Sequence, residues 1–204
     1  MKEKFEFIIP TYDRPNQLMM TTHSIYSQSV DNWRITVVVD APYKGLDKVI
    51  KYFDGDDRIR FDTTLKNGPH NDWGHTPRIR GMEIAEEEWL IMTGDDNYYF
   101  PCFLEAFSSA VDDNTLFIFC DMYHNYSGYD YGSSELRKIP IPGGFRYEGL
   151  DIGAFATRTK LAKQIPFYRH LHWADGKFAA DYWEKHCKVH GSIKKIPKGF
   201  YVHN

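Results

Sequence analysis

Apolar runs and segments of helical spacing alternate along the first 120 residues. Five runs rich in β-branched and aromatic residues predict strands, at residues 4–9, 33–40, 58–62, 89–93 and 115–120. Four segments between them space their apolar residues three or four apart and predict helices, at residues 15–29, 46–53, 77–88 and 101–111. The strands are apolar without clean alternation, as in strands covered on both faces. The pattern therefore predicts an α/β fold with a mostly parallel sheet.

The pattern becomes irregular in the second half of the chain. Residues 121–148 show little periodicity and carry five tyrosines, namely Tyr123, Tyr126, Tyr129, Tyr131 and Tyr147. Such a stretch is typical of a functional loop or of a surface loop. Further on, residues 152–158 predict a strand, residues 181–191 a helix closed by a glycine, and the last residues two short extended pieces. The sequence has no repeat or interdomain linker, so we expect one domain over residues 1–204.

Composition and charge narrow the class of protein. The chain has 204 residues, 42% hydrophobic and 26% charged, and a net charge of −3, so no basic field is available for nucleic acid or an anionic membrane. Its three cysteines form no CxxC pair, as expected in a reducing compartment. The first residues are charged and then strand-like, unlike a signal peptide, and no apolar run approaches the roughly 20 residues of a membrane span. We expect a soluble, cytoplasmic protein.

Polar residues follow three of the predicted strands, at Pro10–Arg14, Asp40 and Gly94–Asn97. In an open parallel sheet, ligands bind outside the carboxyl ends of the strands. Carboxylates there can accept hydrogen bonds from a ribose or a base, and a divalent cation with oxygen ligands would hold a diphosphate beside them. Asp95 and Asp96 repel each other, so they either form an ordinary solvated turn or have a positive charge between them. The residues alone leave both interpretations open.

Three stretches carry a resemblance that no single motif establishes. They read FIIPTYDRPNQL…SIYSQSVDNWRITVVVD, HTPRIRGMEIAEEEWLIMTGDDNYYFP and AADYWEKHCKVHGSIKKIP. Their order and spacing resemble those of the family 2 glycosyltransferases, which are nucleotide-sugar enzymes of the Rossmann-like GT-A fold. The resemblance implies a GT-A domain whose residues 1–120 bind the nucleotide and whose residues 121–204 hold the acceptor and the catalytic base. It also implies that the enzyme transfers a sugar from a nucleoside diphosphate sugar to an acceptor hydroxyl with inversion. The implied nucleotide is UDP, and the implied metal is Mn²⁺ or Mg²⁺.

The resemblance implies roles for individual residues as well. The donor would be held by Pro10, Thr11, Asp40, Arg78 and Asp95. Asp96 matches the metal-binding carboxylate of the family's Asp-x-Asp turn. His203 follows the last strand, where these enzymes often place a second metal ligand; the other interpretation is a solvated histidine. The sequence departs from the family pattern at Gly94, which replaces the first Asp of the turn, and at Ile79, where Asn is usual. The second strand also ends in one Asp where the family often has two.

Asp181 stands where the family keeps its catalytic base. An inverting transfer needs a carboxylate that takes the proton of the acceptor hydroxyl as the oxygen attacks the anomeric carbon. The structural interpretation is that Asp181 caps a helix, with Glu184 three residues later as its partner. The family's preceding Glu is Ala180 here, so Asp175 is kept as the alternative base.

The resemblance also implies a binding cleft, and the sequence defines the acceptor side of this cleft less well than the donor side. The tyrosine-rich segment fits a lid, because aromatic faces pack against sugar C–H surfaces, and it fits equally a loop whose rings pack on the domain. Candidates for the same cleft are Trp73, Tyr147, Asp151 and Trp173.

Other classes of protein remain as alternatives. The residues Gly94 and Ala180 leave open a nucleotide-sugar or carbohydrate-binding module of the same fold without catalysis. A nucleotidyltransferase would need a glycine- and lysine-rich opening loop, and the sequence has neither that loop nor a GxGxxG or GxxxxGK[ST] motif. Zinc ligation by His170, His172, His186 and His190 is less favoured, because His186 falls on the same helical stripe as aromatic residues.

Overall fold

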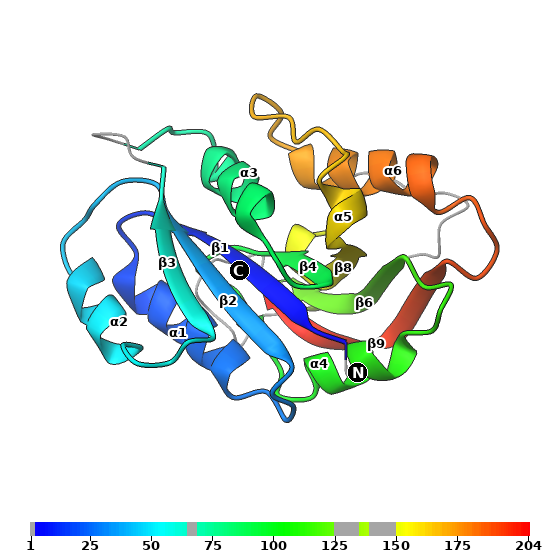
Figure 1. Ribbon diagram of the computed structural model, residues 1–204, viewed down its shortest axis with the longest axis horizontal. Coiled ribbons are helices and arrows are strands. Elements are labelled where there is room, and N and C mark those ends of the chain that lie inside the picture. Colours follow the sequence, from blue (N-terminus) through cyan, green and yellow to red (C-terminus); the bar gives the residue numbers. More distant parts are fainter. Residues whose placement is uncertain (1–2, 65–68, 125–134, 139–149) are drawn as a thin grey trace.

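The computed structural model describes residues 3–64, 69–124, 135–138 and 150–204, in which strands and helices alternate (Figure 1). The helices are α1 (Pro15–Tyr26), α2 (Leu46–Tyr52), α3 (His75–Ile84), α4 (Phe103–Ala110), α5 (Thr159–Ala162), α6 (Ala174–His186) and the 3₁₀ helix η2 (Ile152–Ala154). The strands are β1 (Phe5–Thr11), β2 (Trp33–Val39), β3 (Ile59–Thr63), β4 (Trp89–Met92), β5 (Tyr98–Tyr99), β6 (Phe117–His124), β7 (Glu135–Arg137), β8 (Phe155–Arg158) and β9 (Ile193–His203). Among the residues described, none of the helices combines the length and the apolar character that a bilayer crossing needs.

Within these residues the strands form one mixed sheet in the order β3-β2-β1-β4-β8-β6-β9-β5, with β7 beside β6. β3, β2, β1 and β4 run parallel, as the sequence predicts, and β6 pairs in parallel with β9. β8 runs antiparallel between β4 and β6. The carboxyl ends of β1, β2 and β4 therefore lie at the same edge of the sheet. The predicted α/β fold is confirmed.

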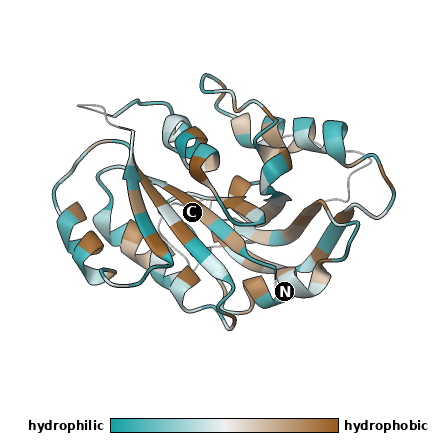
Figure 2. Cartoon of the chain, in the orientation of Figure 1, coloured by the Kyte–Doolittle hydropathy of each residue, from teal (hydrophilic) through white to brown (hydrophobic). Residues whose placement is uncertain are grey.

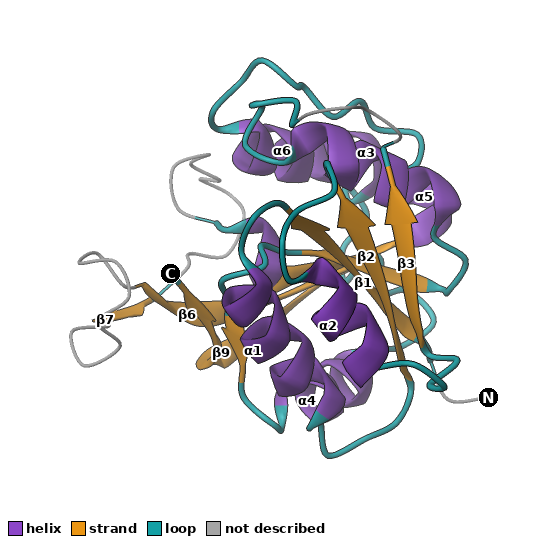
Figure 3. Cartoon of the chain, turned by 90° about the vertical axis from the view of Figure 1, so that its left-hand side faces the viewer, coloured by secondary structure: helices purple, strands orange, loops and turns teal. Residues whose placement is uncertain are grey.

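Helices cover both faces of the sheet (Figure 3). α3, α5 and α6 lie on one face, and α1, α2 and α4 lie on the other. Figure 2 shows apolar residues concentrated along the strands and polar residues along the outward surfaces of the helices. Helix α3 packs tightly on β1, since a Cβ at Gly81 would lie 2.1 Å from Ile8 Cγ2. A Cβ at Gly74 would lie 3.2 Å from Pro10 Cβ, so the start of α3 meets the end of β1.

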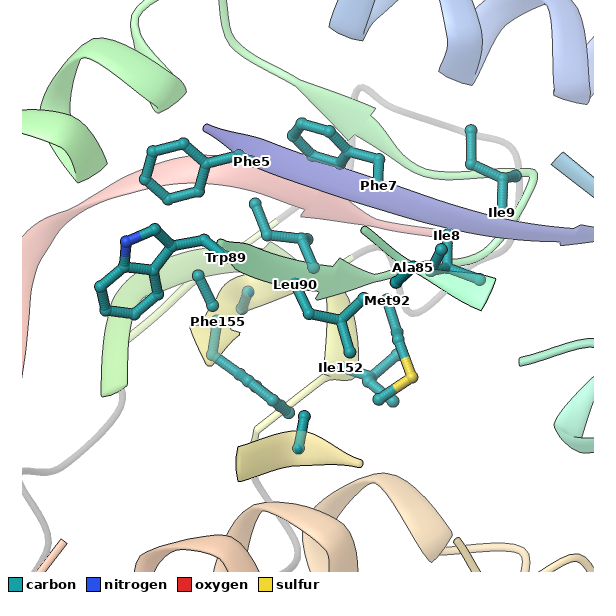
Figure 4. Packing of buried hydrophobic residues seen from close by; sticks show 14 of the residues in the cluster. Phe5, Phe7, Ile8, Ile9, Ala85, Trp89, Leu90, Met92, Ile152 and Phe155 are labelled. Atoms are coloured by element: carbon teal, nitrogen blue, oxygen red, sulfur yellow. The ribbon is translucent and has the colours of Figure 1, made fainter. Parts of the chain in front are cut away.

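The core between these layers is rich in aromatic side chains (Figure 4). Phe5 of β1 stacks on Trp89 of β4 with ring centroids 5.9 Å apart, and both are fully buried. The buried carboxylate of Glu6 accepts hydrogen bonds from Thr36, Arg60 and two backbone N–H groups just after α3. A buried charge is costly unless it is paired and hydrogen-bonded, so this network fixes β1 against β2, β3 and the end of α3.

The last quarter of the chain differs from the sequence prediction. The two short extended pieces form the single strand β9, whose register against β6 shifts on either side of Asp121. Helix α6 begins at Ala174, well before Asp181, and Trp173 precedes it without a side-chain cap. The predicted helix N-cap at Asp181 is therefore wrong, because that residue lies inside the helix. In the first half of the chain, the helix predicted at residues 77–88 also differs: it is α3, which begins at His75 and ends at Ile84.

Candidate functional site

A cavity of about 630 Å³ opens at the carboxyl ends of β1, β2 and β4. The segment before α3, the start of α6 and the end of β9 complete its wall. The lining residues are Pro10, Thr11, Tyr12, Arg14, Asp40, Pro69, Asn71, Asp72, Trp73, Gly74, His75, Pro77, Arg78, Gly94, Asp95, Asp96, Asn97, Asp151, His172, Asp175, His203 and Asn204. Ligands of open α/β sheets bind at this edge, so the cavity is the candidate site.

Asp95 is buried and held by groups from β1 and α1. Thr11 Oγ1 donates a 2.8 Å hydrogen bond to Asp95 Oδ2. Thr21 Oγ1 lies 2.8 and 2.7 Å from the carbonyl oxygens of Asp95 and Asn97, which fixes the turn after β4. Burial raises the pKa of Asp95 to about 6; the Thr11 bond opposes this change and the adjacent Asp96 carboxylate adds to it. Asp95 can therefore gain or lose a proton near pH 6.

Arg14 supplies a positive charge to the two aspartates. Its Nη1 lies 2.7 Å from Asp96 Oδ2 and 3.5 Å from Asp95 Oδ1. Of the two interpretations left open by the sequence, the pair with a cation beside it is the one observed, and in this structure the cation is a side chain. A Cβ at Gly94 would lie 2.8 Å from Asp96 Oδ1, so the glycine makes room for the Asp96 carboxylate.

Asp40, directly after β2, is oriented by the segment that precedes α3. Its Oδ2 accepts a 2.8 Å hydrogen bond from the His70 N–H, and its Oδ1 contacts His70 Nδ1. Thr64 Oγ1 donates a 2.7 Å hydrogen bond to the Asp40 carbonyl oxygen. A carboxylate has four lone-pair positions, so Asp40 is fixed in direction and can still accept a hydrogen bond from a ligand in the cavity.

The turn before α3 places three residues in the left-handed region, with φ of +54° at Asn71, +57° at Trp73 and +79° at Gly74. For the two residues that are not glycine, this conformation costs on the order of 1 kcal/mol each. Arg78 Nη1 holds the turn by donating a 2.8 Å hydrogen bond to the Trp73 carbonyl oxygen. Strained backbone that the fold maintains on a cavity wall is typical of a functional site.

Asp151 connects the C-terminal strand to the cavity. Its Oδ1 accepts hydrogen bonds from the Gly153 N–H at 2.8 Å and from the Tyr201 hydroxyl. Its Oδ2 lies 3.4 Å from His203 Nε2. Tyr201 is fully buried, and burial raises the pKa of its hydroxyl, which therefore remains a donor. These contacts hold the His203 ring at the cavity wall.

Asp175 lies in the first turn of α6 and lines the cavity, whereas Asp181 does not. Asp181 lies further along the helix, in an ion pair with Lys177 one turn before it. Burial raises the pKa of Asp175 to about 6; Arg78 opposes this change and the carboxylate of Asp151 adds to it. A carboxylate with this pKa is an effective proton acceptor near neutral pH.

Several buried polar atoms of the cavity residues have no hydrogen-bond partner within the part of the chain that the structure describes. They are Asp72 Oδ1, Arg78 Nε, Asp175 Oδ1 and His203 Nδ1. Buried polar groups in folded proteins are nearly always hydrogen-bonded. These atoms lie around one cavity, where a bound molecule can supply hydrogen-bond partners.

The donor set suits a divalent cation that arrives with a ligand. Among the described residues, no three His, Cys, Asp or Glu side chains are placed to hold a metal ion by themselves. Asp96, Asp151 and His203 nevertheless line the same cavity. Mg²⁺ is usually bound by one or two carboxylates together with phosphate oxygens and water, and Mn²⁺ favours the same ligands. The residues therefore fit such a cation when a diphosphate supplies the remaining ligands.

The chain matches the family model described as glycosyl transferase family 2 over residues 6–173, most of its length. The chain belongs to glycosyl transferase family 2. A relative from Rickettsia bellii, named an uncharacterized glycosyltransferase, is 25% identical to this family 2 chain over 136 residues. The aligned region is 67% of this chain and 19% of that protein, so the family 2 chain spans about a fifth of its relative.

Solved structures share the fold of this family 2 chain. TarS 1–349 of S. aureus has a TM-score of 0.73 and 18% identity, over 98% of this chain and 60% of that one. A mannosyltransferase of Pyrobaculum calidifontis, PcManGT, has a TM-score of 0.68 and 14% identity, over 100% and 57%. Glucosyl-3-phosphoglycerate synthase of Mycobacterium tuberculosis has a TM-score of 0.64 and 12% identity, over 99% and 72%. At these identities the likeness concerns the fold, and the predicted GT-A fold is confirmed.

The structure brings the predicted donor and metal residues of this family 2 chain into one cavity. These residues are Pro10, Thr11, Asp40, Arg78, Asp95, Asp96 and His203. Trp73, Asp151 and Asp175 line the same cavity, whereas Asp181 and Trp173 do not. Tyr147 and most of the tyrosine-rich segment lie outside the described residues. These residues therefore lie in one cavity, and the role of each residue stays a prediction.

Some lining residues received no role from the sequence. Tyr12 and Arg14 belong to the PTYDR motif after β1, so their position at a strand end was a usable signal. Asp72 and His75 belong to the segment HNDWGH, whose histidines lack a second ligand group at zinc-like spacing, so the sequence assigned them no role. His172 lines the cavity from just before α6; the sequence considered it only as a less favoured zinc ligand.

Proposed function

We propose that the chain transfers a sugar from a nucleoside diphosphate sugar, with UDP as the preferred nucleotide, to an acceptor hydroxyl with inversion at the anomeric carbon. The observation that carries the proposal is one cavity that joins polar residues at the ends of parallel strands to a carboxylate, Asp175, with a pKa of about 6. Membership of family 2 supports a transferase. TarS has been solved in complex with UDP-GlcNAc, and PcManGT in complex with GDP-Man and Mn²⁺, which supports a nucleotide-sugar donor.

Residues at the strand ends would hold the nucleotide. The Asp40 carboxylate, oriented by His70, can accept an N–H of the base, and the partly exposed ring of Tyr12 offers a stacking face in the same cavity. Asp95 can accept a ribose hydroxyl. Arg78, whose Nε has no partner among the described residues, can donate a charge-assisted hydrogen bond to a phosphate.

Asp96 and His203 would hold Mn²⁺ or Mg²⁺ together with the diphosphate. When it is bound, the cation neutralises charge that develops on the departing diphosphate. Arg14 already neutralises part of the charge of Asp96 in this structure, so the Asp96 carboxylate must exchange Arg14 for the cation. Arg14 would then be available to a phosphate oxygen.

We propose Asp175 as the base in place of Asp181. The support is position, since Asp175 lines the cavity and Asp181 is paired with Lys177 outside it. The acceptor hydroxyl gives its proton to the Asp175 carboxylate while its oxygen bonds to the anomeric carbon. The bond from that carbon to the diphosphate oxygen breaks, and the electron pair leaves with the diphosphate. Attack from the side opposite the diphosphate inverts the configuration of the carbon.

Calorimetric titration with UDP, GDP and CDP, each with and without Mn²⁺, tests the donor site. We expect UDP to bind most tightly and only with metal, and Asp96→Ala to remove that binding. Asp62→Ala is the matched control, because Asp62 pairs with Arg80 outside this cavity. If no nucleotide shows metal-dependent binding, the proposed donor site is wrong.

A second candidate is a nucleotide-sugar binding module without catalysis. The observation in its favour is the ion pair between Arg14 and Asp96 beside Gly94, which occupies the expected metal-binding carboxylate. Incubation with a panel of UDP-sugars separates the two candidates. An enzyme releases UDP with time and loses that release in Asp175→Asn while it keeps its UDP affinity. A binding module takes up the UDP-sugar and releases no UDP.

A further inference from the structure

We propose that Trp73 and the carboxylates beside it form an acceptor subsite for an uncharged saccharide, whose ring lies on the indole. This inference rests on the proposed function, since it names the acceptor class of the same cavity. Its basis is a large, exposed aromatic side chain that a fixed turn holds at the wall of the cavity that Asp175 also lines.

The turn that carries Trp73 is fixed on both sides. Asp72 Oδ2 accepts hydrogen bonds from the Thr76 N–H at 3.0 Å and from the Thr76 hydroxyl at 2.5 Å. Arg78 holds the carbonyl oxygen of Trp73, and a Cβ at Gly74 would already press on Pro10. The indole is therefore presented by a preorganised backbone, which lowers the entropic cost of binding a ligand.

The indole is open to a ligand. Trp73 is 58% exposed although it lines a cavity. Its ring centroid lies 5.4 Å from that of His172, nearly perpendicular to it, and 5.7 Å from that of His75. Large apolar side chains that stay exposed on a concave wall mark binding sites. A flat aromatic surface of this size matches the C–H face of a sugar ring.

The neighbours of Trp73 connect it to the proposed base. His172, whose ring contacts the indole, is among the groups with an electrostatic effect on Asp175, as are Arg78 and Asp151. Trp73 and Asp175 line the same cavity, so a sugar ring on the indole would share that cavity with the proposed base. The Oδ1 atoms of Asp72 and Asp175 have no partner among the described residues and can accept sugar hydroxyls after small side-chain rotations.

Charge decides between acceptor classes. Asp72, Asp151 and Asp175 put three carboxylates on this part of the wall, and the charge of the nearby Arg78 guanidinium is assigned to a phosphate of the donor. A phosphorylated or carboxylated acceptor would meet like charges, whereas hydroxyl groups find acceptors. The subsite therefore selects an uncharged saccharide over an anionic acceptor.

The test is saturation-transfer NMR and calorimetry on the full chain saturated with UDP and Mn²⁺. The probes are methyl glycosides, short neutral oligosaccharides, and glucose 6-phosphate and 3-phosphoglycerate as anionic counterparts. We expect a neutral saccharide to bind and the anionic probes not to. Trp73→Leu should weaken saccharide binding about tenfold, and Trp73→Phe should retain most of it. Tyr52→Leu is the matched control, an aromatic side chain 61% exposed on α2, outside the cavity.

The inference is overturned if no saccharide binds, if the anionic probes bind more tightly, or if Trp73→Leu binds as the unmodified chain does. UDP affinity should be unchanged in all three variants, which shows that they fold. The same saccharide titrations without nucleotide test the subsite alone. Failure of UDP to bind therefore counts against the proposed donor site, whereas loss of saccharide binding with UDP bound counts against the Trp73 subsite.

Discussion

The guanidinium of Arg14 lies 2.7 Å from the Asp96 carboxylate, in the position where a metal ion is expected when the donor is bound. Two adjacent carboxylates, of which Asp95 is buried, are stabilised by a nearby cation, and Arg14, the residue before α1, supplies one. Arg14 and a divalent cation should therefore compete for Asp96. If they compete, metal binding should be weak until a diphosphate supplies further ligands.

Arg14→Gln should raise the affinity of the nucleotide-free chain for Mn²⁺. The Arg14 side chain is 47% exposed, and ion pairs of this exposure are worth roughly 0.2–1 kcal/mol, so we expect a gain of roughly up to fivefold. Electron paramagnetic resonance of free Mn²⁺ measures the affinity directly. Arg80→Gln, which breaks the ion pair with Asp62 outside the cavity, is the matched control. Unchanged or weaker Mn²⁺ binding in Arg14→Gln would show that the two cations do not compete.

The roles of the two aspartates of α6 can be separated by activity. Asp175→Asn should lower the turnover of a UDP-sugar roughly 10²- to 10⁴-fold, because proton transfer to the base is lost, while UDP affinity is kept. Asp181→Asn should change turnover little, since it removes only a partly exposed ion pair with Lys177. The opposite order of effects would restore Asp181 as the base and would mean that α6 rearranges on donor binding.

The assignment of Asp175 as the base also predicts how kcat/KM depends on pH. With a pKa of about 6, Asp175 is a carboxylate above pH 6 and a neutral acid below it. As the base it is needed in the ionised form, so kcat/KM should rise about tenfold per pH unit below pH 6 and level off above it. A profile without an inflection near this pH contradicts the assignment. Circular dichroism at each pH shows whether the chain stays folded over the range measured.

Burial of Asp175 should also cost stability at neutral pH. The pKa of Asp175 is higher in the folded chain than in the unfolded chain. Its contribution to the free energy of unfolding is therefore intact below about pH 4 and is lost as pH rises through 6. Asp175→Asn should therefore increase the free energy of unfolding at pH 7.5 by on the order of 1 kcal/mol, because the side chain is partly accessible at the cavity. The difference should vanish near pH 4. Urea denaturation at the two pH values measures it, and a loss of stability at pH 7.5 would contradict the prediction.

The donor half of the site was predictable because it follows from topology. Parallel strands end at one edge of the sheet, so Thr11, Asp40 and Asp95 had to come together once β1, β2 and β4 were recognised. The contact of Arg14 with Asp96 joins residues 82 positions apart through a long side chain, and no local pattern specifies it.

The sequence assigned the base to Asp181 through the family resemblance, and the role of either aspartate stays a prediction. The start of the helix was misplaced for a local reason: Asp181 followed by Glu184 resembles a helix N-terminus, whereas α6 begins at Ala174 behind Trp173, a residue without capping chemistry. Packing of Phe178 and Tyr182 in the core sets where this helix lies, and the cavity therefore receives Asp175. The division into a nucleotide half and an acceptor half stays a prediction, and the proposed acceptor residue Trp73 belongs to the first half.

The final prediction concerns the hydroxyl of Tyr201. This buried group donates to Asp151, whose other oxygen faces His203, so it orients the histidine proposed for the metal. Tyr201→Phe should cost about 1–3 kcal/mol of unfolding free energy, because a buried carboxylate oxygen loses a donor, and should weaken Mn²⁺-dependent UDP binding. Tyr99→Phe is a close control: its ring packs 5.1 Å from that of Tyr201, but its hydroxyl donates to the Gly153 carbonyl.

The control separates stability from orientation of His203. Both variants remove one hydroxyl from the same buried aromatic cluster, so urea denaturation should show losses of similar size. Calorimetry with UDP and Mn²⁺ should show weaker binding only in Tyr201→Phe. The hydroxyl of Tyr201 donates to the Asp151 carboxylate, whereas the hydroxyl of Tyr99 donates to the Gly153 carbonyl oxygen. Equal UDP affinities in the two variants would mean that Asp151 does not orient His203 for the metal, and that its bond with Tyr201 serves only to join β9 to the start of η2.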